Sequence, residues 1–206
     1  MANLTRREAI GIVGVGVLLL SAECLPSANA APAQSAVRPP GAPVSEKEFL
    51  ARCIRCQKCI DACDTRVIET MSLGSSLKGA FTPVLNFDYS WCNLCGRCWQ
   101  VCPTGALSAG RIQESSPKVP AIAEVDRASC IAWSWSGCTI CFDECPEEAI
   151  ELGEHGRPYV LDDKCTGCGL CQLKCPNASV RSFSDGNKQK GIVVLSRESK
   201  GKGGVS

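Results

Sequence analysis

The chain has 206 residues and 17 of them are cysteine, about 8%, several times the share found in an ordinary globular protein. Lys and Arg number 22 against 21 Asp and Glu, and this net charge of +1 gives no overall basic field that would indicate nucleic-acid binding and no acidic excess that would indicate disorder. Aromatic residues make up only 5%, so we expect something other than side chains to fill part of the core.

Residues 1–30 have the three parts of an export signal. The pair Arg6-Arg7 precedes a weakly apolar, Gly-rich run over residues 10–20, and Ala28-Asn29-Ala30 is typical of a cleavage site. This pattern resembles the twin-arginine signal, which exports proteins already folded around a cofactor, with an ordinary signal for unfolded export as the alternative. We expect a periplasmic protein, peripheral to the inner membrane, that has lost Cys24 with its signal. The apolar run is shorter than the roughly 20 residues of a spanning helix, so we expect no membrane span in the mature chain.

The next segment connects the signal to the fold. Residues 31–45 are rich in Ala and Pro and predict a flexible linker. A helix is expected to begin after Ser45, because Ser at the N-cap and Glu48 at the third helical position form a capping box. We expect the folded domain to span residues 46–199 and a solvated tail to follow over residues 200–206.

The sixteen remaining cysteines form four groups of four, an internal repeat that we number as motifs 1 to 4. Motifs 1, 2 and 4 have the spacing C-x2-C-x2-C-x3-C, and motif 3 stretches the first interval to seven residues. The groups are Cys53, Cys56, Cys59 and Cys63; Cys92, Cys95, Cys98 and Cys102; Cys130, Cys138, Cys141 and Cys145; and Cys165, Cys168, Cys171 and Cys175. Three thiolates on one tight loop suit three irons of a cubane, and in two-cluster ferredoxins the fourth cysteine ligates the other cluster. The sequence predicts four 4Fe–4S clusters bound by these sixteen cysteines.

Other kinds of cysteine site fit this spacing less well. Cysteines separated by two intervening residues do not readily close disulfides of good geometry. Structural zinc uses separated C-x2-C pairs with no third cysteine left over. No C-x2-C-H segment exists for covalent haem, and the only histidine, His155, is expected in a solvated loop. Cys130 is separated from the other three cysteines of motif 3 by the stretched interval. The third site is therefore expected to hold either a full cubane or a three-iron core.

The motifs together resemble the NapG/MauM family of ferredoxin-type proteins. The likeness includes the paired arginines, the RPPGA stretch at Arg38 to Ala42, the CIRCQKCIDAC and CTGCGLCQLKCP motifs, and the stretched third motif ending in CTICFDECP. It implies an α+β fold made of two bacterial-type ferredoxin-like modules, each with two 4Fe–4S clusters and a small core of short strands and helices. It also implies a periplasmic carrier that passes electrons from a membrane-bound quinol-oxidising iron–sulfur protein to a periplasmic oxidoreductase, as in nitrate reduction.

How the motifs pair stays open at this point. The short gap between motifs 3 and 4 predicts a hairpin, with strands over residues 150–152 and 157–161, and a strand is also expected over residues 84–88 before motif 2. This favours sequential pairing, 1 with 2 and 3 with 4. The family is related to iron–sulfur subunits of molybdenum oxidoreductases, in which motif 1 pairs with 4 and motif 2 with 3. Asp64, which replaces the Pro found after the other three motifs, favours that nested pairing and tips a nearly even choice toward it.

The residues around the motifs indicate an electron carrier without its own substrate site. No nucleophile–base arrangement, phosphate loop or dinucleotide fingerprint is present. Two alternatives are a fixed electron-transfer subunit of a periplasmic molybdenum oxidoreductase and a maturation factor for a periplasmic metalloenzyme. Trp133 and Trp135, inside motif 3, either shield a cluster or form a docking surface. Six cations lie beside the motifs and either offset the anionic clusters or serve solubility: Arg52, Arg55, Lys58, Arg97, Lys164 and Lys174.

Overall fold

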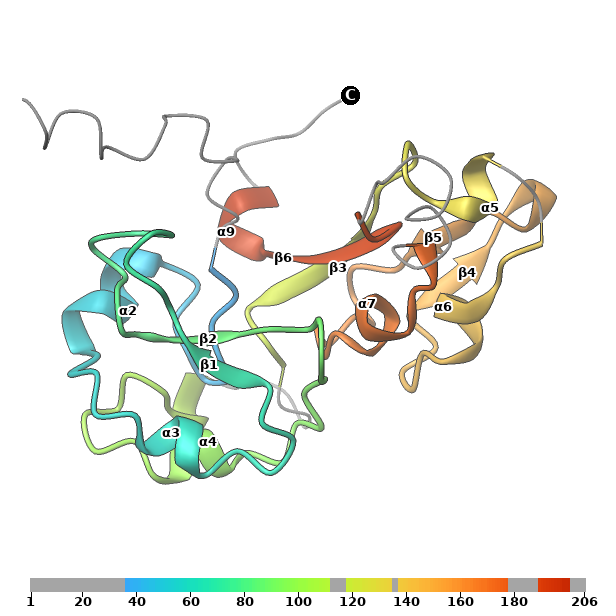
Figure 1. The fold of residues 1–206 in the computed structure, drawn as a ribbon. Coiled ribbons are helices and arrows are strands. Elements are labelled where there is room, and N and C mark those ends of the chain that lie inside the picture. The colour runs from blue at the N-terminus through green and yellow to red at the C-terminus, as the bar shows by residue number, and fades with distance from the viewer. Residues whose placement is uncertain (1–35, 112–117, 135–136, 178–188, 201–206) are drawn as a thin grey trace, which may run out of the picture. The chain divides into compact units, whose positions relative to one another are not determined.

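The computed structural model describes residues 36–111, 118–134, 137–177 and 189–200 (Figure 1). The expected signal at 1–30, residues 31–35, Trp135 and residues 201–206 of the expected tail lie outside them. Within the described ranges, no helix is both long enough and apolar enough to cross a membrane. In chain order the elements are α2 (Glu46–Arg52), α3 (Lys58–Asp61), β1 (Ile68–Thr70), β2 (Pro83–Leu85), α4 (Arg97–Gln100), η1 (Ala109–Arg111), β3 (Ala121–Val125), α5 (Ile131–Ser134), α6 (Ile140–Asp143), β4 (Ile150–Leu152), η2 (Glu154–Gly156), β5 (Pro158–Val160), α7 (Leu170–Lys174), β6 (Ile192–Ser196) and α9 (Arg197–Lys200).

Two hairpins connect the cysteine motifs. Strands β1 and β2 pair antiparallel between motifs 1 and 2, and β4 and β5 pair antiparallel between motifs 3 and 4. The β4–β5 hairpin confirms the prediction over residues 150–161. Strand β2 ends at Leu85, earlier than predicted, because the side chain of Asn86 accepts the backbone N–H of Asp88 at 2.9 Å and turns the chain. Each half of the chain therefore has the order motif, hairpin, motif.

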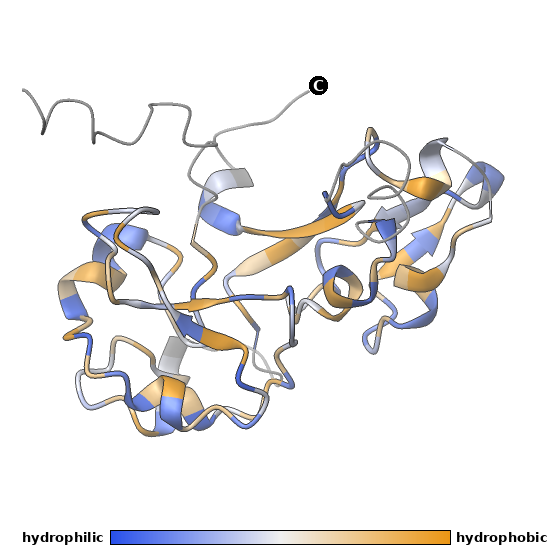
Figure 2. Cartoon of the chain, in the orientation of Figure 1, coloured by the Kyte–Doolittle hydropathy of each residue, from blue (hydrophilic) through white to orange (hydrophobic). Residues whose placement is uncertain are grey.

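A third pair of strands was not anticipated from the sequence. Strand β3 follows motif 2 and pairs antiparallel with β6, which follows motif 4, so that Ala123 faces Val194. Both strands are apolar (Figure 2), and Ala121, Ile122 and Ile192 have at most 2% of their surface exposed. This ladder joins the segment before motif 3 to the segment after motif 4.

The segment before α2 belongs to the fold rather than to a linker. Residues 37–43 are buried, and the carbonyl of Val37 accepts the N–H of Leu85 at 2.8 Å. Arg38, only 3% exposed, donates to the Thr82 hydroxyl at 2.8 Å and to the Pro83 carbonyl at 2.7 Å, and it forms a two-bond ion pair with Glu46. The expectation of a flexible linker is therefore wrong for residues 37–43, because the RPPGA segment packs under the β1–β2 hairpin.

Helix α2 begins after Ser45 as predicted, but its cap differs. The Ser45 side chain makes no capping hydrogen bond. Instead, the carboxylate of Glu198, in α9, accepts the backbone N–H of Glu46 at 2.9 Å. A residue from the far end of the chain thus satisfies one of the free N–H groups at the start of α2.

Candidate metal centres

The ligand loops share an unusual backbone turn. In the residue just before the second cysteine of each motif, φ is positive: 59° at Arg55, 58° at Leu94, 95° at Gly137 and 70° at Gly167. Left-handed residues within a tight loop form the concave backbone nests, lined by N–H groups, that bind phosphates and iron–sulfur clusters. Motif 3 keeps this turn despite its stretched first interval, so Cys138 is equivalent to the second cysteine of the other motifs.

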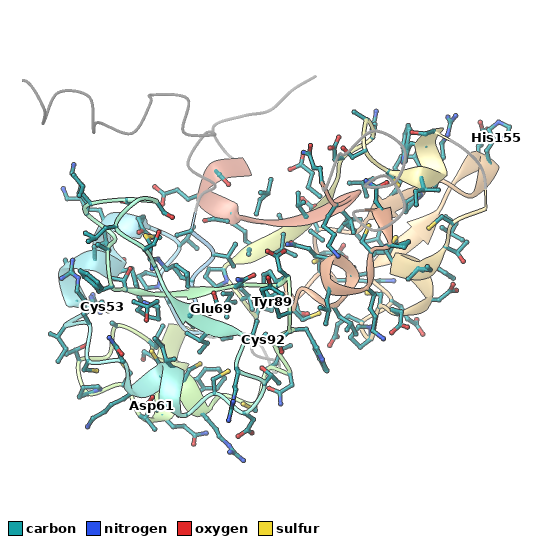
Figure 3. All side chains as sticks on the ribbon, in the orientation of Figure 1. Cys53, Asp61, Glu69, Tyr89, Cys92 and His155 are labelled. Atoms are coloured by element: carbon teal, nitrogen blue, oxygen red, sulfur yellow. The ribbon has the colours of Figure 1, made fainter. Side chains whose placement is uncertain are left out.

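The cysteines meet in four groups, each with three from one motif and the fourth from its neighbour in sequence. Three groups line cavities, and we name them by the motif that supplies three ligands: site 1 (Cys53, Cys56, Cys59, Cys102), site 3 (Cys130, Cys138, Cys141, Cys175) and site 4 (Cys165, Cys168, Cys171, Cys145). Figure 3 labels Cys53 of site 1 and Cys92 of motif 2 among the side chains. Cys130, although distant in sequence from its motif, lies in the wall of site 3.

Site 2 consists of Cys63, Cys92, Cys95 and Cys98. The pKa of Cys92 is raised to about 12, first by burial and also by the nearby charges of Cys63 and Cys95. Burial raises the pKa of Cys98 to about 12, and the charge of Cys92 raises it further. Cys63 of motif 1 thus completes the site of motif 2, as Cys102 of motif 2 completes site 1.

The motifs pair sequentially, and the indication of nested pairing drawn from Asp64 is wrong. The carboxylate of Asp64 forms an ion pair with the guanidinium of Arg97, next to Cys98 in motif 2. Asp64 therefore links motif 1 to motif 2, the motif that completes its site. The other half has a similar link, because Lys174 of motif 4 lies 3.5 Å from the carboxylate of Glu144 in motif 3.

Burial keeps these thiols protonated when no metal is bound. It raises the pKa of Cys59 to about 11 and that of Cys141 to about 12, and the pKa of Cys171 lies well above its ordinary value for the same reason. A thiolate at such a site is stable only with a metal beside it, so metal binding must displace these protons.

The cysteines that cross between motifs accept backbone hydrogen bonds. The N–H of Leu107 lies 3.4 Å from Cys102 Sγ, that of Ala149 lies 3.3 Å from Cys145 Sγ, and that of Gly191 lies 3.3 Å from Cys175 Sγ. Desolvation acts to raise the pKa of Cys102, but the N–H of Leu107 and the Thr104 groups outweigh it and lower that pKa. N–H groups aimed at ligand sulfurs stabilise the negative charge of a bound cluster.

The donor sets fit a cluster better than a single ion. All sixteen cysteines are free thiols. In the part of the chain that the structure describes, no three His, Cys, Asp or Glu side chains come together closely enough to bind one metal ion. Four thiols around a cavity, with nests beside them, fit a 4Fe–4S core, whereas tetrahedral zinc needs its ligands in contact with one atom.

Comparison with known proteins supports this interpretation. A family model for the 4Fe-4S dicluster domain matches residues 52–106 and again 129–179, one match for each sequential pair of motifs. The ferredoxin-type protein NapG of Escherichia coli is 34% identical over 183 residues, covering 82% of this chain and 77% of NapG. The methylamine utilization ferredoxin-type protein MauM of Methylorubrum extorquens is 35% identical over 190 residues, covering 83% and 84%.

The chain belongs to the NapG/MauM family of ferredoxin-type proteins. It is an iron–sulfur electron-transfer protein, and its two dicluster domains correspond to four 4Fe–4S clusters.

The structure of this ferredoxin-type protein also places His155 and Trp133, which the sequence analysis singled out. His155 is exposed at the tip of the β4–β5 hairpin, far from the labelled cysteines in Figure 3, as predicted. Trp133 is half-buried, with the guanidinium groups of Arg127 and Arg157 at 4.4 Å and 5.0 Å from its ring centre. These cations cover the ring, which argues against a free docking surface at Trp133, and Trp133 is not among the residues that line site 3.

Several of the predicted cations bond to neighbouring protein groups. Arg55 donates to the carbonyls of Lys78 and Ala80 at 3.1 Å and 2.9 Å, so it ties the β1–β2 loop to motif 1. Arg52 pairs with Glu48 on α2 at 2.9 Å. The residue that sequence reasoning missed is Arg38, whose guanidinium carbon lies 4.6 Å from the ring centre of Phe49, a wall residue of site 1. The available signals were an arginine within a Pro-rich stretch and the place of that RPPGA stretch in the family resemblance.

Proposed function

We propose that this protein carries electrons in the periplasm, from a membrane-bound quinol-oxidising iron–sulfur protein to a periplasmic oxidoreductase. The observation that supports it is the gathering of all sixteen motif cysteines into four sites that adjoin one another. The MauM relatives are named for methylamine utilization, so the partner oxidoreductase need not belong to nitrate reduction. Bound 4Fe–4S clusters would supply the one-electron chemistry, and the thiols and nests of the chain hold and shield them.

Metal analysis of native protein tests this proposal. We expect about sixteen irons and as many acid-labile sulfides per chain, in protein purified without oxygen. Low-temperature EPR during a redox titration should show reduced signals broadened by interaction between neighbouring sites. Little iron, together with zinc or oxidised cysteine pairs, would contradict the proposal.

The location can be tested separately. We expect the substitutions Arg6→Lys and Arg7→Lys together to keep the protein in the cytoplasmic fraction, because the twin-arginine route requires the paired guanidinium groups. Arg66→Lys, at an exposed position of the folded part, is the matched control and should leave export unchanged. Export of the double variant at the native level, or a native protein found only in the cytoplasm, would argue against a periplasmic carrier.

A further inference from the structure

Within each half, the two sites adjoin through short helices. Helix α3, which carries Cys59 of site 1, packs against α4, which carries Cys98 of site 2. In the other half, α6 carries Cys141 of site 3 and packs against α7, which carries Cys171 of site 4. Site 1 is therefore next to site 2, and site 3 is next to site 4.

The two halves meet at sites 2 and 4. The backbone N–H of Cys92, a ligand of site 2, donates to the carbonyl of Cys168, a ligand of site 4, at 2.8 Å. Beside this bond Phe87, only 3% exposed, packs against Gly169, where a Cβ would lie 2.0 Å from the Phe87 ring. Gly169 has φ +83° and no room for a side chain, so the two ligand loops come together backbone to backbone.

Sites 1 and 3 have exposed apolar side chains in their walls. Ile54 lines site 1 with 62% of its surface exposed, and Ile140 lines site 3 with 37% exposed. The aliphatic wall residues of site 4, Ala123, Ala149, Ile150 and Val194, are all buried, and Pro146 is its exposed apolar wall residue. An exposed apolar side chain at the rim of a redox site suits the transient docking of another protein.

We propose that the four sites form one line in the order site 1, site 2, site 4, site 3, and that partner proteins exchange electrons at sites 1 and 3. The inference rests on the proposed electron-transfer function and names where its partners bind. A reduced partner loses one electron at one end of the line and an oxidised partner gains one at the other, so the chain returns to its starting state. Neither donor nor acceptor needs to approach site 4, because it lies inside the line between sites 2 and 3.

Iron positions in the native protein test the order directly. We would measure anomalous diffraction at the iron absorption edge from crystals of the loaded protein. The shortest separation between the two halves should join site 2 to site 4, and sites 1 and 3 should be the farthest apart. A shortest separation that involves site 1 or site 3 would overturn the order even if all four clusters were present, and so would leave the proposed function intact.

The docking positions need a measurement of their own. We would follow electron transfer from the dithionite-reduced protein to cytochrome c, a protein probe, and confirm the iron content of every variant. Ile54→Lys combined with Ile140→Lys should slow the transfer several-fold, because cytochrome c is a basic protein and each new cation repels it. Either substitution alone should slow the transfer less, since the other end of the line stays open. Tyr89→Lys, at a position 85% exposed and three residues before Cys92 of site 2, is the control and should not slow it. Slowing by Tyr89→Lys, with none by the two isoleucine substitutions, would place exchange at site 2, where Cys95 is exposed, and would overturn the assignment of the ends.

Discussion

Replacing Cys53 and Cys102 together with alanine should leave three intact clusters, whereas replacing Cys53 and Cys175 together should leave two. Cys53 and Cys102 line the same cavity, so both substitutions damage site 1 alone. Cys175 lines site 3, so the second combination damages two sites. Iron analysis and integration of the reduced EPR signal will count the intact clusters, with about four irons in each.

A second double variant, at site 2, controls for general loss of structure. Cys63→Ala combined with Cys92→Ala should again damage one site, because both cysteines belong to site 2. If the variant that combines Cys53 with Cys175 kept three clusters and the one that combines Cys53 with Cys102 kept two, motif 1 would share its cluster with motif 4, and the sequential pairing would be incorrect.

Arg38→Ala should cost about 3 kcal/mol of stability, the lower part of the range for breaking a buried ion pair, since Glu46 is 37% exposed and regains some solvation. The substitution also leaves the Pro83 carbonyl without its charged donor and removes the cation from the face of Phe49. Phe49 lines site 1, so we expect this loss to reach the cluster site as well. The measurement is the temperature at which the cluster absorbance is lost.

Two further substitutions make this result specific. Arg52→Ala breaks an exposed pair with Glu48 on the same helix and should cost no more than about 0.5 kcal/mol. Arg38→Lys keeps the charge but cannot reproduce the planar set of hydrogen bonds, so it should fall between the native protein and Arg38→Ala. Equal midpoints for Arg38→Ala and Arg52→Ala would show that the buried arginine does not hold the hairpin.

Local spacing predicted the parts of the sites that form within one loop. Three cysteines with two residues between neighbours must share one loop. The sequence therefore predicted the three ligands that each of motifs 1, 2 and 4 supplies to its own site. The β4–β5 hairpin was readable for the same reason, because its strands and its Gly-containing turn are neighbours in the chain.

Features that depend on distant segments were not readable. Strand β6 completes its ladder only with β3, and the apolar pattern of either strand does not identify its partner. The Pro-rich segment at residues 37–43 has the composition of a linker, yet Arg38 finds Glu46 and Thr82 and is buried there. Composition indicates how flexible a segment is when it is solvated, whereas its burial depends on which other part of the chain packs over it.

The sequence by itself determined the sixteen candidate ligands, the iron–sulfur chemistry and the electron-transfer class, because ligand type and local spacing carry that information. Only the tertiary structure decided which fourth cysteine completes each site and which two sites meet between the halves. Asp64 shows why: alone it suggested the nested arrangement, and only its contact with Arg97 shows that it joins motif 1 to motif 2. A crossing ligand and a backbone contact such as that of Cys92 with Cys168 are set by how hairpins and strands pack, and packing joins residues that no local pattern connects.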